Sequence, residues 1–346
     1  MSKFLVFSDL HLHNWQYGAT YSNGWNSRLL AQQNVLNQIV ECCEERNINN
    51  VFFCGDLFHT HGKVDAACLS IASNFFQKLL HRDIEAVVLI GNHDLVDKEK
   101  TINSLRWLGG YSNISLIIKN SYFVCPGMVC AATSYTENKE YLEDILDNTS
   151  KDSFVFMHQG VSGIPVGSDF VIPNEILTPD MIPSHVKHAF TGHYHSHKRI
   201  NDKLTIVGAP MQHTWADSGE DRGWLVVDSE TGEYERVLSN APKFVKISGQ
   251  TLSHYTKDIP GNYIRIEEDI KENDKEELRK HFMGSGALSV EFAYKNPKKR
   301  IICDEQVRDF NLNNVIDKFQ KSKNLNERDI KIGQHLREGT YETDIS

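Results

Sequence analysis

The chain has 346 residues, of which 40% are hydrophobic and 24% are charged, and its formal net charge at pH 7 is −9. This length allows one large domain plus a smaller one. Binding to the phosphates of nucleic acid normally requires a basic surface, so the acidic total argues against tight DNA binding by this chain alone. It does not exclude a nucleic-acid substrate, because metal ions and a partner can supply positive charge.

Leader and membrane segments are not evident in the sequence. The first apolar run, residues 4–7, is far shorter than a signal peptide and is soon followed by Asp9. No apolar stretch approaches the roughly 20 residues of a membrane-spanning helix. The seven cysteines show no Cys-x-x-Cys spacing, which favours buried reduced thiols over disulfides or a zinc knuckle. We therefore expect a cytoplasmic protein.

The first hundred residues predict alternating strands and helices. Apolar runs at residues 3–7, 51–54 and 86–90 are typical of buried parallel strands. Between them, residues 27–46 and 65–80 carry apolar side chains at helical spacing. The order is therefore β-α-β-α-β. In open α/β sheets, ligands bind beyond the carboxyl ends of the strands.

Side chains that can bind metals follow each of these strands, and two later ones. Residues 153–157 form another apolar run, and Ala189-Phe190 leads into Gly192. Side chains two residues apart on an extended segment point the same way, so we expect such pairs to face one site. The residues at the five strand ends are Asp9, His11, Asp56, Asn92, His93, His158, His193 and His195.

The other predicted elements complete a first domain of residues 1–240. Short strands are expected at residues 114–118, 122–124, 128–131, 204–207, 224–228 and 233–237, and helices at 99–108 and 138–146. Residues 160–187 are rich in glycine and proline and are expected to form a rim over the site, with a short helix near 174–181.

The composition changes near residue 240, where turn signals begin. Residues 262–294 read as strand, helix and strand, so residues 241–303 are expected to form a small α+β domain. The basic run 298–300 is more consistent with a solvated turn than with a phosphate contact. Residues 304–346 are polar with a sparse apolar stripe, which is typical of a helical tail that packs on a partner.

The eight strand-end residues form a mixed carboxylate, imidazole and amide set without a thiolate. Such donors suit manganese, iron or zinc. Seven candidate ligands exceed the needs of one ion, so two ions are expected, with Asp56 as the bridging carboxylate. Two ions about 3.5–4 Å apart can stabilise both the attacking and the leaving oxygen of a phosphoryl displacement.

These motifs resemble those of the calcineurin-like metallophosphoesterases. The match runs in order through Asp9-x-His11, Gly55-Asp56, Gly91-Asn92-His93-Asp94, His158 and Gly192-His193-x-His195. Within that superfamily, Gly55-Asp56-Leu57-Phe58-His59 and Gly208-Ala209-Pro210 are similar to the SbcD family of bacterial, archaeal, eukaryotic and phage nucleases. The resemblance covers roughly residues 3–240, and beyond them only the layout agrees.

The resemblance implies a role for each site residue. Asp9, His11 and His195 would hold one ion, Asn92, His158 and His193 the other, and Asp56 would bridge. His93 would be the catalytic histidine that protonates the leaving oxygen, and His59 would help to position the DNA strand. Asp94 is expected to orient His93 or a turn amide, and no role is assigned to His61.

The resemblance also implies an architecture and an activity. The fold would be α/β, a four-layer αββα metallophosphoesterase sandwich with a small α+β capping domain and a C-terminal helical tail. The activity would be manganese-dependent DNA cleavage, exonuclease on duplex ends and endonuclease on single strands or hairpins. Magnesium, iron or zinc are alternatives to manganese. The partners would be DNA, an SbcC-like coiled-coil ATPase and a second copy of the chain.

Three further points stay open at this level. The helix at 65–80 and the loop after Gly91 are candidates for the dimer interface. The compartment would be the cytoplasm of a bacterium or of an infected host cell. The rival functions are a small-molecule phosphodiesterase or phosphatase on the same scaffold, and a non-catalytic scaffold, which the filled ligand positions disfavour.

Overall fold

The computed structural model describes residues 2–97, 102–166, 170–171, 174–248, 258–268 and 270–293. The chain divides into two compact units, residues 1–295 and 296–346, and every element described here belongs to the first. The basic run 298–300 and the expected tail 304–346 lie outside the described residues. No helix of the described segments is both long and apolar enough to cross a membrane.

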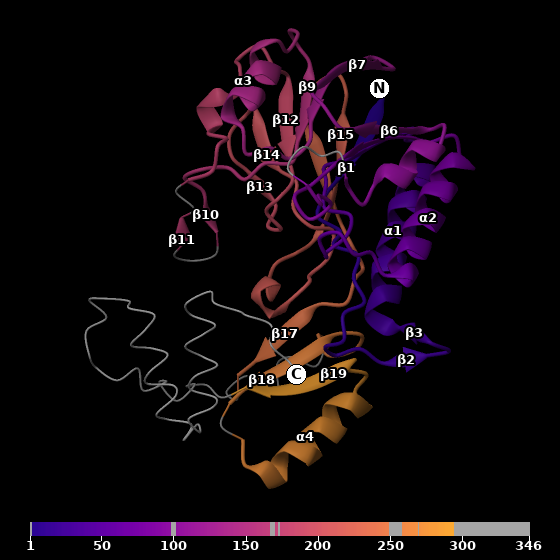
Figure 1. The fold of residues 1–346 in the computed structure, drawn as a ribbon. Coiled ribbons are helices and arrows are strands. Elements are labelled where there is room, and N and C mark those ends of the chain that lie inside the picture. Colours follow the sequence, from indigo (N-terminus) through magenta and orange to yellow (C-terminus); the bar gives the residue numbers. More distant parts are fainter. Residues whose placement is uncertain are drawn as a thin grey trace, which may run out of the picture. The chain divides into compact units, whose positions relative to one another are not determined.

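Two six-stranded sheets form the centre of the first unit (Figure 1). The first has the order β16 (Tyr234–Leu238), β15 (Gly223–Asp228), β1 (Lys3–Phe7), β4 (Asn50–Phe53), β5 (Glu85–Leu89) and β6 (Ile114–Ile117). The second has the order β13 (Lys198–Arg199), β14 (Leu204–Ile206), β12 (His188–Thr191), β9 (Phe154–Met157), β8 (Met128–Thr133) and β7 (Ser121–Cys125). Within each sheet, four neighbouring strands are parallel: β1, β4, β5 and β6, and β14, β12, β9 and β8.

The inner faces of the two sheets pack on each other through aromatic side chains. Phe52 and Phe156 come from different sheets, and their rings stack with centroids 3.9 Å apart. Phe4 touches these two rings and those of Phe154 and Phe190 edge-on, with centroids 5.0–6.3 Å apart. Strands buried on both faces explain why the sequence shows continuous apolar runs instead of alternation.

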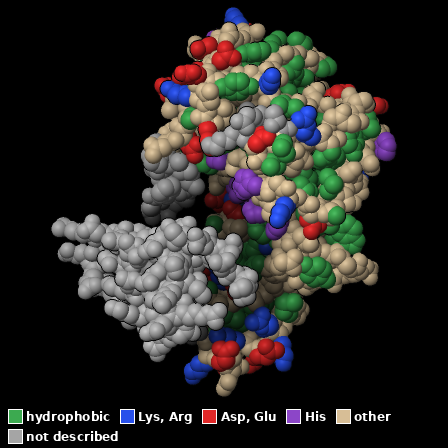
Figure 2. Space-filling model, in the orientation of Figure 1, with side chains coloured by type: hydrophobic (Ala, Val, Ile, Leu, Met, Phe, Trp, Pro, Cys, Tyr) green, Lys and Arg blue, Asp and Glu red, His purple; other side chains and the backbone are tan. Residues whose placement is uncertain are grey.

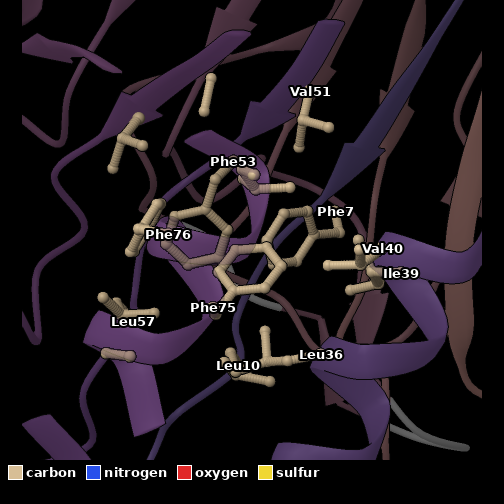
Figure 3. Close-up of a cluster of buried hydrophobic side chains, with 14 of the residues drawn as sticks. Phe7, Leu10, Leu36, Ile39, Val40, Val51, Phe53, Leu57, Phe75 and Phe76 are labelled. Carbon is tan, nitrogen blue, oxygen red and sulfur yellow. The ribbon is translucent and has the colours of Figure 1, made fainter. Parts of the chain in front are cut away.

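Helices cover the outer faces. Helices α1 (Ser27–Glu45) and α2 (Ala66–Leu80) begin at the caps Asn26 and Asp65, whose side chains accept backbone N–H groups. They cover the first sheet, and Figure 3 shows Phe75 and Phe76 of α2 against Phe7 and Phe53 of the strands. Helix α3 (Lys139–Asp147) packs on the second sheet. The four-layer αββα fold is thereby confirmed.

Residues beyond 240 form a smaller sheet. Strands β17 (Phe244–Ile247), β18 (Tyr263–Glu267) and β19 (Ser289–Ala293) are parallel, and α4 (Glu272–Gly284) connects the last two. This is the expected strand, helix and strand unit, extended by β17. That strand was not predicted, since four residues are too few to show a period. The domain boundary at residue 240 remains a proposal.

Two predicted helices are wrong in length. Only a 3₁₀ turn, Arg106–Gly110, forms within the described part of residues 99–108. Asn103 accepts the backbone N–H of Leu105, and such side chains compete with a helix for backbone donors. Near 174–181 only the 3₁₀ turn Pro179–Met181 forms. The remaining short elements are β2 (Tyr21–Ser22), β3 (Trp25–Asn26), β10 (Pro165–Val166), β11 (Phe170–Val171) and a 3₁₀ turn at Trp215–Asp217.

His188 at the start of β12 makes the fold sensitive to acid. It is buried, its Nε2 lies 2.8 Å from Thr205 Oγ1, and burial lowers its pKa from 6.5 to about 4. A base with a lowered folded-state pKa stabilises the fold above pH 6.5 and loses that contribution as pH falls toward 4. Between pH 7.5 and 5, we expect this one group to remove about 2 kcal/mol from the free energy of unfolding.

Urea unfolding of the wild type and His188→Gln at both pH values measures this effect. The variant keeps a polar side chain next to Thr205 but has no proton to gain. Its free energy of unfolding should therefore fall by about 2 kcal/mol less than that of the wild type. Equal losses in the two proteins would contradict the assignment.

Candidate active site

The eight predicted side chains all follow the carboxyl ends of parallel strands. Strands β1, β4 and β5 of the first sheet and β9 and β12 of the second end within three residues of the first predicted ligand that follows them. Figure 2 shows histidine side chains gathered on one face of the molecule. The two sheets thus bring together residues that are up to 186 positions apart in sequence, from Asp9 to His195.

Asp56 lies between two groups of these residues. Its Oδ2 is 3.5 Å from His11 Nε2 and 3.4 Å from His158 Nε2. The side chain is 2% exposed, so water does not compete for these oxygens. One carboxylate oxygen therefore faces two imidazoles that have no contact with each other in the structure, which is the arrangement that a bridging ligand requires.

The first group contains Asp9, His11 and His195. The Nε2 atoms of His11 and His195 are 3.1 Å apart. A carboxylate oxygen of Asp9 and one nitrogen of each histidine all lie within 4.8 Å of one another, so the three could hold one ion.

The second group contains Asn92, His158 and His193. The Oδ1 atom of Asn92 is 3.0 Å from His158 Nε2 and 2.9 Å from His193 Nδ1. The opposite nitrogen of His158, Nδ1, faces the carbonyl of Cys54 at 2.5 Å, which fixes the ring with Nε2 toward the site. Asp9 also lies within 4.8 Å of Asp56 and His158, so the assignment of the ligands to two sets stays a prediction.

The backbone reaches this arrangement through left-handed turns. Asp9, His11, Asp56 and His193 have φ angles of 53°, 48°, 61° and 85°. Such a conformation costs roughly 1 kcal/mol or more for a residue with a side chain, and it persists at functional sites where the surrounding structure enforces it. The ligands therefore converge by turning after each strand and not by the alternation of an extended strand that the spacing suggested.

Glycines beside the ligands leave room for close approach. A Cβ atom at Gly91 would lie 2.1 Å from Asp56 Oδ1, and one at Gly192 would lie 2.1 Å from Ser8 Oγ. Both distances are far below van der Waals contact, so only glycine fits. The loops from β4, β5 and β12 can meet because these positions have no side chain.

The site concentrates buried charge. Burial opposes ionisation of Asp56, yet the neighbouring histidines hold the pKa of this carboxyl well below its usual range. Burial would lower the pKa of His158, but the carboxylates of Asp56 and Asp9 raise it to about 9. Burial raises the pKa of Asp9 to about 7. Buried carboxylates are stable when they are paired with cations or bind metals, and this donor set fits divalent ions of the borderline class.

His93 and His59 lie beside the first group. The backbone N–H of His93 donates to Asp56 Oδ1 at 2.9 Å. The ring atom Nδ1 of His93 is 2.6 Å from the His59 carbonyl. The ring of His93 stands perpendicular to that of His11 with centroids 4.7 Å apart, so the turn after Gly91 directs it toward the site. His59 Nδ1 is 3.4 Å from His11 Nδ1, and its ring packs on Trp15.

Asp94 binds turn amides, as expected. Its buried carboxylate accepts the backbone N–H groups of Gly91, Asp56, Leu57 and Phe58. It thereby ties the loop after β5 to the loop after β4. His61 is exposed, but its ring stacks on that of His93 at 4.6 Å, a contact that the sequence did not indicate.

Sequence reasoning missed a supporting layer behind the ligands. The ring atom Nε2 of His213 lies 3.0 Å from the carbonyl of Asp9, and the backbone N–H of His213 donates to the carboxylate of Asp217. Arg222 pairs with Asp217 at 2.7 Å and also donates to the carbonyl of His195. The available signal was the run of polar residues after Gly208-Ala209-Pro210, but nothing in their spacing relates them to Asp9 or His195.

Two hollows border the centre at different ligands. One of about 640 Å³ is lined by Asn92, His61, Tyr135 and neighbouring residues. The other, of about 440 Å³, is lined by His193, His195, Tyr194, Lys198 and others. Each has the size of a pocket for a small organic group.

The αββα sandwich thus carries a buried cluster of carboxylates and histidines, able to hold metal ions, at the carboxyl ends of its parallel strands. Residues 2–197 match the model of the calcineurin-like phosphoesterase family, and the chain belongs to this family. It is therefore a phosphoesterase hydrolase, and members of this family use divalent metal ions.

Relatives of the chain are distant. It is 24% identical over 213 residues to a putative phosphoesterase of Invertebrate iridescent virus 6, which covers 58% of this chain and 73% of that one. It is 25% identical over 238 residues to exonuclease subunit 1 of Enterobacteria phage T4, which covers 67% of each chain. Among solved structures, a dimetal phosphatase from Danio rerio has a TM-score of 0.44 at 13% identity, over 65% of this chain and 91% of that one.

Proposed function

We propose that the chain is the nuclease subunit of an SbcCD-like complex for DNA repair, recombination or replication. It would cleave DNA phosphodiesters as an exonuclease on duplex ends and an endonuclease on single strands and hairpins. The named relative that points to this substrate is the exonuclease subunit of phage T4. Manganese is the metal that the resemblance to the SbcD family implies, and the carboxylate, amide and imidazole donors suit iron and zinc as well.

The observation that carries the proposal is the pair of hollows beside the site, one at Asn92 and the other at His193 and His195. A phosphodiester has an organic group on each side of its phosphorus, whereas a monoester has one. With the phosphate at Asp56, one group would enter the hollow at Asn92 and the other the hollow at His193 and His195. Volumes of about 640 and 440 Å³ accept nucleosides.

Each predicted residue then has a defined task. Asp9, His11 and His195 would hold one ion, Asn92, His158 and His193 would hold the other, and Asp56 would bridge them. When bound, the two ions stabilise charge on the attacking and leaving oxygens. The His59 carbonyl can accept the Nδ1 proton of His93, which orients the ring with Nε2 free; in the imidazolium form, protonated on both nitrogens, His93 would donate the Nε2 proton to the leaving oxygen.

Partners would supply what this chain lacks. The net charge of −9 is consistent with a subunit that leaves much of DNA binding to an SbcC-like ATPase. The word subunit in the name of the phage relative supports a complex. A homodimer would bury exposed apolar side chains at the two candidate interfaces. These are Leu69 of α2, 38% exposed, and Val96 and Ile102 of the loop after Gly91, 51% and 59% exposed.

His93→Ala tests the proposal most directly. The wild type with Mn²⁺ should degrade linear duplex and single-stranded DNA, and the variant should be slower by about 10²–10⁴-fold because it lacks the proton donor. Since the metal ligands are intact, the variant should still bind two ions, as measured by elemental analysis after gel filtration. Bis-p-nitrophenyl phosphate and p-nitrophenyl phosphate serve as small diester and monoester substrates.

Three outcomes would replace the proposal. Cleavage of the small diester without any cleavage of DNA, even with an added ATPase partner, would indicate a small-molecule phosphodiesterase. Faster cleavage of the monoester than of the diester would indicate a phosphatase. Inactivity on every substrate, with metal bound, would favour a non-catalytic scaffold.

A further inference from the structure

Glu175 contacts the site from the loop over its rim, and none of the motifs includes it. Its side chain is 25% exposed, and its Oε1 accepts the hydroxyl proton of Tyr194 at 3.1 Å. The same oxygen lies 4.0 Å from His193 Nε2. One carboxylate oxygen therefore faces both aromatic residues of the His193-Tyr194 pair.

The fold makes space for this carboxylate. A Cβ atom at Gly160 would lie 2.4 Å from Glu175 Cδ and 2.6 and 2.7 Å from its two oxygens. Gly160 follows His158 by two residues, so Glu175 packs against the backbone that carries one ligand while facing another. Packing against Gly160 therefore holds the carboxylate near His193 in addition to its hydrogen bond with Tyr194.

The two ring nitrogens of His193 have different surroundings. Nδ1 is 2.9 Å from Asn92 Oδ1, inside the second ligand group, whereas Nε2 faces Glu175. A neutral imidazole carries one proton, and a metal needs the nitrogen without it. Binding through Nδ1 therefore requires the proton on Nε2, where a carboxylate can accept it.

We propose that Glu175 is a positioning residue that holds His193 in the Nε2–H form and presents Nδ1 to the ion at Asn92 and His158. A side-chain movement that shortens the 4.0 Å separation by roughly 1.1–1.3 Å brings it into the range of a charge-assisted hydrogen bond. Carboxylates behind metal-binding histidines fix the ring and raise its basicity. This inference rests on the proposed two-metal centre, but not on DNA as the substrate.

The test measures Mn²⁺ binding to the full chain by calorimetry, with no substrate present. The wild type should bind two ions. Glu175→Ala should weaken one of the two sites by about 10–100-fold and leave the other unchanged. Glu175→Gln, whose amide oxygen still accepts a proton without a charge, should fall between the two proteins.

Tyr194→Phe is the matched control, because it removes the same Tyr194 to Glu175 hydrogen bond without touching the carboxylate. Its two sites should stay within about 2-fold of the wild type. Nitrogen-15 NMR of His193 should show the proton on Nε2 in the wild type and a mixture of the two forms in Glu175→Ala. Circular dichroism checks that each variant folds.

Three results would overturn the inference. If Tyr194→Phe weakened Mn²⁺ binding as much as Glu175→Ala, the carboxylate would only anchor Tyr194. If Glu175→Ala bound both ions like the wild type, Glu175 would have no part in metal binding, while the proposed nuclease would stand. A wild type that binds fewer than two ions would instead overturn the two-metal centre and this inference together.

Discussion

Replacing Asp56 with asparagine is expected to weaken the binding of both metal ions and to slow hydrolysis of bis-p-nitrophenyl phosphate by roughly 10³-fold or more. The reason is that one oxygen, Oδ2, faces His11 of one group and His158 of the other, at 3.5 and 3.4 Å. Asparagine has a similar size and keeps an oxygen for the His93 N–H. The readouts are Mn²⁺ stoichiometry and the rate of hydrolysis.

His195→Ala is the control for this prediction. Among the proposed ligands, His195 lies with Asp9 and His11, its Nε2 3.1 Å from His11 Nε2, so its loss should release one ion and leave the second. The comparison separates a bridging ligand from an ordinary one. If Asp56→Asn kept one ion as tightly as His195→Ala does, Asp56 would belong to a single site.

Gly91→Ala is expected to lower the free energy of unfolding by about 3 kcal/mol and to abolish metal binding. The added Cβ would lie 2.1 Å from Asp56 Oδ1 and 2.4 Å from the Asp56 backbone nitrogen. Because backbone is one of the two obstacles, a side-chain rotation cannot relieve the clash. Either the loop after β5 or the loop after β4 must move, and Asp56 moves with it.

Gly109→Ala is the matched control. A Cβ at Gly109 would meet nothing within 4 Å, and the backbone there lies outside the left-handed region, so this variant should be unchanged or more stable by up to about 1 kcal/mol. Urea unfolding and Mn²⁺ calorimetry compare the two. Normal Mn²⁺ binding by Gly91→Ala would show that the loops tolerate the extra methyl group.

Much of the fold was predictable because its strands are buried on both faces. The sequence before Asp9, Gly55 and Gly91 is dominated by apolar runs. Strands β1, β4 and β5 end at the last residue of the predicted runs or one residue before it. The five strand-end motifs then indicated which residues meet. Their order in the sequence and the rule that ligands bind at the carboxyl edge of parallel strands were sufficient.

The rest depends on contacts that no local pattern encodes. Glu175, Tyr135 and His213 reach the site from loops, where neither period nor cap relates them to a ligand. The reason that His193 and His195 face different groups is the positive φ of His193, and a spacing of two residues cannot reveal it. In the described residues 102–108, Asn103 accepts the backbone N–H of Leu105 and so competes with the predicted helix for a donor.

Arg28 connects the smaller sheet to the ligand Asp9 through a short chain of contacts. Its guanidinium is buried, lies 5.1 Å from the ring of Phe244 and 5.5 Å from that of Tyr263, and donates to the carbonyl of His213 at 2.7 Å. His213 in turn contacts the carbonyl of Asp9. Strands β17 and β18 are therefore connected to the predicted ligand Asp9 through the contacts of Arg28 and His213. A movement of this sheet would therefore have to displace Arg28 and His213, and with them the backbone of Asp9.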